Sequence, residues 1–208
     1  MTDSTTSTAP LSAIALVCTL KPSPAESSSQ LLATQILDEL AANEVTGTAV
    51  RLADYDVKAG VELDEGDGDA WPRIREQIIA SDILVIVTPT WMGHLSSIAQ
   101  RALERLDAEL SETDDKGRPL VEGKVAVVGV VGNEDGAHAI AADLFQGLND
   151  VGFSIPSQAS TYWNGEAMGS VDYKDLDETP ESVASTTASM AKNAAHLARV
   201  LRAQPYQH

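Results

Sequence analysis

The sequence contains one cysteine, Cys18, among 208 residues. A single cysteine excludes an intrachain disulfide and a cysteine-based metal cluster. Cys18 lies within an apolar strand pattern, which favours a small buried hydrophobic residue over the alternative, a catalytic thiol. The four histidines are also scattered, without the spacing of metal ligands. No metal site is therefore expected.

Basic residues are scarce: 14 Lys and Arg stand against 31 Asp and Glu, a formal net charge of -17. Nucleic acids and anionic membranes both require a basic face, so neither is expected as a partner. No apolar run approaches the roughly 18 residues of a membrane span. Residues 1–10 are rich in Ser and Thr, without a basic start or an apolar signal core. We therefore expect a cytoplasmic protein with a disordered tail over 1–10 and a single domain over 11–204.

Several common functional motifs are absent. The sequence has no G-x-x-x-x-G-K-[ST] loop and no G-x-S-x-G elbow, which argues against a P-loop nucleotidase and a hydrolase. The glycines at Gly129, Gly132 and Gly136 do not match the G-x-G-x-x-G dinucleotide fingerprint. The carboxylates of segment 63–69 do not follow the spacing of an EF-hand, so we interpret this segment as a solvated acidic loop and not as a calcium site.

Strand and helix patterns alternate along the chain, which predicts an α/β fold with a parallel sheet. The runs at 83–87 and 124–131 are continuously apolar, as expected for central strands buried on both faces, whereas 48–53 is weaker and suggests a sheet edge. Strands are expected at 12–18, 48–53, 83–87, 124–131 and 153–155, the last one resuming near 159. Helices are expected at 28–42, 71–80, 96–110, 138–151 and 181–203, and the charged side chains of the third, including Arg101 and Arg105, are expected on its exposed face.

Three loops follow the first, third and fourth expected strands. In a doubly wound sheet of order 2-1-3-4-5 these strands are neighbours, so the three loops meet at one edge. The first loop carries Thr19 and Lys21 and ends in Ser27, Ser28 and Ser29 at a helix start. Hydroxyls and free amides at a helix N-terminus suit a phosphate, although a serine there can also be an ordinary helix cap.

The second loop, 88–94, reads Thr-Pro-Thr-Trp-Met-Gly-His. Trp91 could stack on a planar ring or belong to the core, and Gly93 permits close approach of the backbone. The third loop carries Gly132, Asn133, Glu134, Asp135 and Gly136. Its amides could hold the edge of a heterocycle, or it could be an ordinary turn.

The segment 80–96 combines an Ala-Ser-Asp start, an apolar strand, Thr88-Pro89 and a short aromatic and glycine loop. With the other two loops it resembles the flavodoxin-like superfamily, most closely its NAD(P)H-dependent FMN reductase and quinone oxidoreductase branch. The resemblance spans 12–151 and the C-terminal helix. The helix segment 99–105 is also similar to the helix that follows this loop in the family. It implies a flavodoxin-like, five-stranded parallel sheet with helices on both faces.

The resemblance also implies FMN as cofactor. The residues implied at its phosphate are Thr19, Ser27, Ser28 and Ser29, with Lys21 in place of the Arg that the family commonly has in a Gly-Ser-x-Arg loop. The residues implied along the isoalloxazine are Pro89, Thr90, Trp91, Met92 and Gly93 on one side, and Gly132, Asn133, Glu134, Asp135 and Gly136 on the other.

The implied function is hydride transfer from NADH or NADPH through flavin to a quinone, a free flavin or a similar acceptor. The flavin carries the chemistry; His94 could hydrogen-bond the acceptor or simply cap the next helix. Two alternatives stay open: an electron carrier without nicotinamide activity, which the acidity suits, and a flavodoxin-fold protein that has lost FMN, which the altered first loop suits. The family resemblance implies a homodimer or homotetramer. The segment 156–179 could cover the flavin, and its Trp163 could be a dimer contact or a small separate core.

Overall fold

The computed structural model describes residues 10–207, so the expected tail lies outside the described residues except for Pro10. Five parallel strands form the sheet in the order β2-β1-β3-β5-β6. They are β1 (Leu11–Val17), β2 (Val45–Arg51), β3 (Ile83–Trp91), β5 (Val125–Gly132) and β6 (Ser160–Asn164). A short strand, β4 (His94–Leu95), pairs antiparallel with the end of β3. Counted among the parallel strands alone, this is the order 2-1-3-4-5, and the expected doubly wound fold is confirmed.

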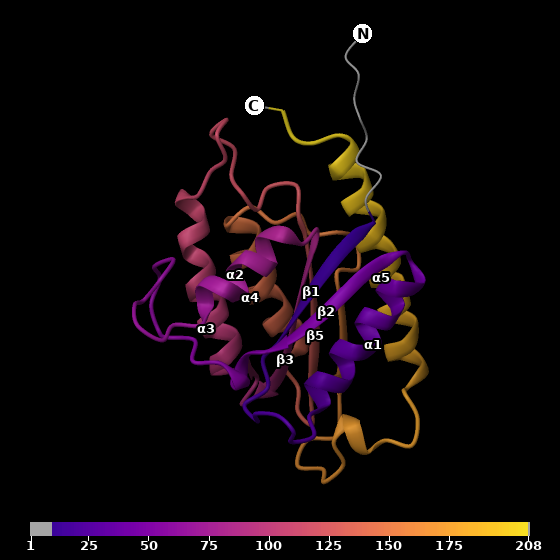
Figure 1. The fold of residues 1–208 in the computed structure, drawn as a ribbon. Coiled ribbons are helices and arrows are strands. Elements are labelled where there is room, and N and C mark those ends of the chain that lie inside the picture. The colour runs from indigo at the N-terminus through magenta and orange to yellow at the C-terminus, as the bar shows by residue number, and fades with distance from the viewer. Residues whose placement is uncertain (1–9, 208) are drawn as a thin grey trace.

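Helices cover both faces of the sheet (Figure 1). One face carries α1 (Ser28–Ala42) and α5 (Glu181–Ala203). The other carries α2 (Trp71–Ala80), α3 (Ser97–Leu106) and α4 (Ala137–Asp150). Alternate side chains of each strand point to opposite faces, so each central strand contributes to both hydrophobic cores.

The burial of the strands follows their sequence patterns. Every residue of β5 from Val125 to Val131 is buried, as is every residue of β3 from Ile83 to Thr88. The edge strand β2 buries only Val45 and Val50. Cys18, directly after β1, is fully buried, and burial raises the pKa of its thiol. Cys18 is therefore a core residue, and the reading of it as a catalytic thiol is wrong.

The fifth strand expected at 153–155 does not form there, whereas its expected continuation near 159 is the strand β6 (Ser160–Asn164). Phe153 is buried in the core, but Ser154 makes only an isolated bridge to Val125. The strand at this position of the sheet is β6, where Thr161 is fully buried and Tyr162 is half-exposed. The apolar side chains suggested a strand at 153–155, but only Ser154 bonds to the sheet there: its amide donates to the Lys124 carbonyl and its carbonyl accepts from the Ala126 amide.

Two further boundaries differ from the expectation. The third helix ends at Leu106 and continues as a 3-10 helix, η2 (Asp107–Ser111). Much of the expected second loop is strand, because β3 extends to Trp91, reverses at Met92 and Gly93 and returns as β4. The backbone φ angles of 53° at Met92 and 77° at Gly93 are those of a tight hairpin turn.

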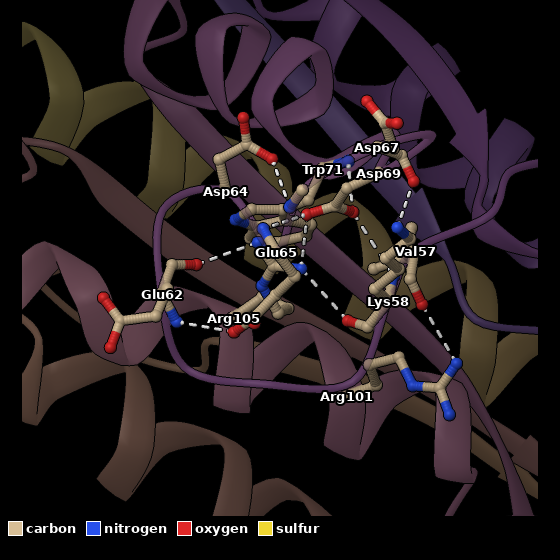
Figure 2. A network of polar contacts seen from close by, with 11 residues as sticks. Val57, Lys58, Glu62, Asp64, Glu65, Asp67, Asp69, Trp71, Arg101 and Arg105 are labelled. Atoms are coloured by element: carbon tan, nitrogen blue, oxygen red, sulfur yellow. Dashed lines mark hydrogen bonds and ion pairs between the residues drawn. The ribbon is translucent and has the colours of Figure 1, made fainter.

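Arg105 is buried, contrary to the expected exposed position. Figure 2 shows its guanidinium at the centre of a polar network that holds the loop between β2 and α2. Its Nη1 donates to Asp69 Oδ2 at 2.7 Å and to the Lys58 carbonyl at 3.0 Å, and its Nη2 donates to the Glu62 carbonyl at 2.8 Å. The guanidinium also lies 5.7 Å from the Trp71 ring centroid. The helical charge pattern could not reveal this position, because the partners come from a distant loop.

Segment 63–69 is therefore more than a solvated acidic loop. The Asp69 side chain is inaccessible to solvent. Burial alone would raise the pKa of Asp69, but hydrogen bonds from the Glu65 amide, Arg105 and further amides lower it to about 2. No group of His, Cys, Asp and Glu side chains within residues 10–207 is arranged to hold a metal ion. Nor does any helix in this range have the length and apolarity to cross a membrane.

Candidate functional site

A cavity of about 430 Å³ lies at the carboxyl edge of the sheet. Its walls come from the segments that follow β1, β3, β5 and β6, which is where parallel sheets place ligands. The lining residues that the sequence predicted are Thr19, Lys21, Ser27, Ser28, Ser29, Pro89, Thr90, Trp91, Gly132, Asn133 and Glu134. The structure thus brings most of the predicted site residues from all three loops into one cavity.

Five predicted site residues lie outside the lining. Met92 is at the hairpin tip with 88% of its surface exposed, and His94 is exposed on β4. Gly93, Asp135 and Gly136 also do not line the cavity. Each loop was expected to be a continuous binding segment, whereas the tip of the hairpin points away from the cavity and Gly136 allows two loops to pack together.

The first loop is fixed by residues at the end of β2. Asp54, in the 3-10 helix η1 (Leu52–Asp54), accepts hydrogen bonds from the Ser23 amide at 2.6 Å and the Ser23 hydroxyl at 2.7 Å. These bonds lower the pKa of the Asp54 carboxyl. Arg51 Nη1 donates to the Ala25 carbonyl at 2.8 Å. Two side chains, Arg51 at the end of β2 and Asp54 in η1, therefore fix the conformation in which the loop approaches α1.

The serines at the start of α1 have different roles. The Ser27 hydroxyl accepts from the Gln30 amide at 3.3 Å, so it caps the helix while it lines the cavity. The Ser28 hydroxyl accepts from the Lys174 amide at 3.3 Å. Ser29 is buried. The first amides of a helix carry partial positive charge and lack intrahelical partners, so this end of the cavity is suited to an anion.

The second and third loops pack against each other. The Met92 amide donates to Glu134 Oε1 at 2.7 Å. Gly136 has a φ of 138°, and a Cβ atom there would lie 2.7 Å from the Gly93 carbonyl oxygen. Glycine is therefore required at Gly136 by both conformation and space. These contacts orient the hairpin that presents Trp91 to the cavity.

Thr90 contains a buried hydroxyl without a partner. Its residue is 4% exposed, and its Oγ1 has no hydrogen-bond partner among residues 10–207. Gly132 allows the close approach, since a Cβ atom there would lie 2.7 Å from Thr90 Cβ. Buried polar atoms normally find a partner. Because this atom is inaccessible from the cavity, it lies beneath the cavity wall and does not provide a contact for a ligand.

A fourth wall is formed by residues between 163 and 174, within the segment 156–179 that was expected either to cover the flavin or to serve as a dimer contact or separate core. Trp163 at the end of β6 lies against Tyr173, with ring centroids 5.6 Å apart. The Tyr173 hydroxyl donates to Gln35 Oε1 on α1 at 2.7 Å, and Asn133 Nδ2 donates to Asp172 Oδ1 at 3.0 Å. The missed lining residues are Leu20, Glu26, Val131, Trp163, Ala167, Met168, Gly169, Asp172, Tyr173 and Lys174. Trp163 lies near the carboxyl end of β6, so the edge rule that placed the other loops at the site also applies to it.

The two ends of the cavity differ in chemistry. Its mouth carries exposed apolar side chains, with Leu20 47% and Trp91 53% exposed and Met168 fully exposed. The end next to α1 carries serine hydroxyls, and among the described residues the lining includes two cationic side chains, Lys21 and Lys174. The arrangement suits an elongated molecule with a planar apolar part and an anionic part.

Residues 13–167 match the NADPH-dependent FMN reductase family. This match covers more than half of the chain, and the chain belongs to that family. The fold and the family together define a flavodoxin-like, flavin-related oxidoreductase.

Relatives support the same class. The chain is 33% identical over 208 residues to 8-demethyl-8-aminoriboflavin-5'-phosphate synthase of Streptomyces davaonensis, covering 94% of this chain and 80% of the relative. A crystal structure of RosB with the bound intermediate 8-demethyl-8-formylriboflavin-5'-phosphate superposes with a TM-score of 0.85 at 31% identity, covering 94% of this chain and 82% of that one. The chain is also 32% identical over 200 residues to the divalent metal cation transporter MntH of Mycobacterium bovis. That similarity covers 93% of this chain but only 29% of the longer relative.

Proposed function

We propose that the cavity binds FMN and that the protein transfers a hydride from NADH or NADPH through the flavin to a quinone, a free flavin or a similar acceptor. Membership of the NADPH-dependent FMN reductase family is the observation that carries this proposal. In the overall reaction the nicotinamide loses a hydride. A quinone acceptor gains that hydride and a proton from solvent, so two electrons and two protons reduce it.

The residues of the cavity fit FMN. A volume of about 430 Å³ lies in the range of small-molecule sites. Ser27, Ser28, Ser29 and the first turn of α1 would hold the phosphate, while Trp91 and the edge of β5 would flank the ring system.

The chemistry assigned to the protein side chains is binding and orientation. FMN, when bound, supplies a ring that accepts and donates hydride. Trp91 covers part of the mouth with an apolar face, on which a nicotinamide or a quinone could stack. His94 pairs with Trp91 across the hairpin and is exposed, so it could donate a hydrogen bond to an acceptor bound at the mouth.

A second candidate function comes from the relative in Streptomyces davaonensis. Its name describes the synthesis of a riboflavin-5'-phosphate derivative altered at position 8. The identity to this relative is 33% and covers 94% of this chain. The alternative function is therefore that the flavin is a substrate whose ring is modified, and not a cofactor. In both cases the same cavity would hold the flavin phosphate.

Anaerobic visible spectroscopy of the purified protein with added FMN tests these functions. Bleaching of the bound flavin by NADH or NADPH, followed by recovery on addition of a quinone, is expected for the proposed reductase. If FMN binds but NADH and NADPH do not reduce it, the reductase proposal is contradicted, and the protein is an electron carrier or a flavin-modifying enzyme. Mass spectrometry of the released flavin distinguishes these two, because only the modifying enzyme changes the mass of the flavin. Absence of binding would favour the protein that has lost FMN.

The remaining partner predictions need separate measurements. The homodimer or homotetramer expected from the family resemblance is tested by light scattering after size-exclusion chromatography. The cytoplasmic location is tested by cell fractionation.

A further inference from the structure

The anionic end of the cavity receives a cation from a segment distant in sequence. Lys174 lies in the 3-10 helix η3 (Tyr173–Asp175) and is 146 positions away from Ser28, to whose hydroxyl its amide donates. The other cation of the lining, Lys21, belongs to the first loop and is exposed. The two lysines therefore line one cavity in a chain with a net charge of -17.

The position of Lys174 is fixed by its neighbours. The preceding Tyr173 is 2% exposed and is hydrogen-bonded to Gln35 on α1, which anchors η3 to that helix. The Lys174 side chain is 20% exposed, and its Nζ lies 2.5 Å from Asp175 Oδ1. It therefore has a defined place in the wall and does not extend freely into solvent.

Acidic residues surround this ammonium group. Glu26 Oε2 lies 3.9 Å from Lys174 Nζ, and Asp172 also acts on it electrostatically. The Glu26 side chain is 86% exposed, so it can turn away from an incoming anion, whereas Asp175 is 46% exposed and adjacent in the chain. Without the lysine, a phosphate at α1 would face these carboxylates directly. Like charges at short distance repel, so the site needs this cation to accept a dianion.

We propose that Lys174 is a specificity-determining residue that binds the phosphate of the flavin, so that the site takes flavin mononucleotide in preference to riboflavin. This inference rests on the proposed function and adds to it the residue that selects the phosphorylated form. Lysine has three donors, so its ammonium group can keep the bond to Asp175 and donate to a phosphate oxygen as well. The segment that closes the fourth wall then also recognises the end of the ligand farthest from the mouth.

Titration of flavins against four proteins tests this role: the wild type, Lys174→Met, Lys174→Arg and the control Lys192→Met. Lys192 is exposed on α5 and does not line the cavity, so the control removes one positive charge elsewhere. Quenching of Trp91 and Trp163, which both line the cavity, reports binding. We expect Lys174→Met to weaken FMN binding about 10- to 100-fold, the range for loss of a hydrogen bond to a charged group, and to leave riboflavin binding unchanged. Lys174→Arg should retain most of the affinity for FMN, and Lys192→Met should behave as the wild type.

The riboflavin measurement distinguishes a general defect in folding from a specific loss of phosphate binding. Equal weakening of both flavins in Lys174→Met would show that the lysine only supports the wall, and unchanged FMN binding would show that it does not contact the phosphate. Either result overturns the assignment while the proposed function stands. If the wild type binds neither flavin, the proposed function and this assignment are both wrong.

Discussion

Replacement of Arg105 by Met should destabilise the protein more than any ordinary charge substitution. The variant leaves the Asp69 carboxylate buried without its partner and removes donors from the Lys58 and Glu62 carbonyls. Breaking a buried ion pair from one side costs about 3–5 kcal/mol. For a domain of about 200 residues, each kcal/mol lowers Tm by about 2–4 °C, so we expect a decrease of about 6–20 °C.

Urea unfolding followed by circular dichroism measures this free energy, with Arg101→Met as the matched control. Arg101 is on the same helix and exposed, and its Nη1 donates one hydrogen bond, to the Val57 carbonyl at 3.0 Å. Its replacement should cost about 1 kcal/mol or less. If Arg105→Met costs no more than this control, the buried pair with Asp69 does not organise the loop and the reasoning is refuted.

The same pair predicts a pH dependence of stability. The pKa of Asp69 is about 2 in the folded protein, against an ordinary value of 3.8. Its stabilising contribution is therefore complete above the unfolded pKa and is lost as pH falls from about 4 through the folded pKa near 2. The difference between the unfolded and folded pKa values of Asp69 corresponds to about 2 kcal/mol of folding stability. In Arg105→Met the carboxyl should protonate more readily, so the free-energy gap between variant and wild type should narrow on acidification. A gap that stays constant between pH 7 and pH 3 would contradict this.

Three further predictions concern the cavity. Thr90→Val replaces an unpaired buried hydroxyl by a methyl group, so it should preserve or raise the stability of the protein by up to about 1 kcal/mol and leave FMN binding nearly unchanged; thermal melts and titrations check the two effects, and loss of stability would argue against an unpaired hydroxyl. Gly136→Ala should cost about 1–3 kcal/mol in unfolding experiments, because its φ is 138° and the new Cβ would meet the Gly93 carbonyl, and a neutral effect would show that the two loops do not pack closely. Trp163→Phe should reduce the quenching of tryptophan fluorescence by FMN, and unchanged quenching would place the flavin away from this wall.

The central part of the fold could be predicted from the sequence because it depends on local apolar content. The continuous apolar runs of β3 and β5 can be satisfied only by strands buried on both faces. Once these strands are parallel neighbours, the loops after them share one edge, so Pro89, Trp91 and Gly132 were predicted to lie together. The edge strand β6 was expected only as a continuation near 159, because it is short and buries only Thr161, which gives it a weaker pattern than the residues at 153–155.

The rest of the site depends on side chains that bond to the backbone of another loop, and no local pattern reports this. Asp54 holds the loop of Ser23, Glu134 holds the hairpin through the Met92 amide, and Ser28 accepts from the Lys174 amide. Ser28 was expected at the ligand because hydroxyls and free amides at a helix start suit a phosphate, and Glu134 because the family resemblance implied it. In the structure Ser28 and Glu134 form hydrogen bonds that join one loop to another. The geometry of the cavity is therefore set by contacts between loops, and substitutions at Asp54 should alter the site although its side chain does not line it.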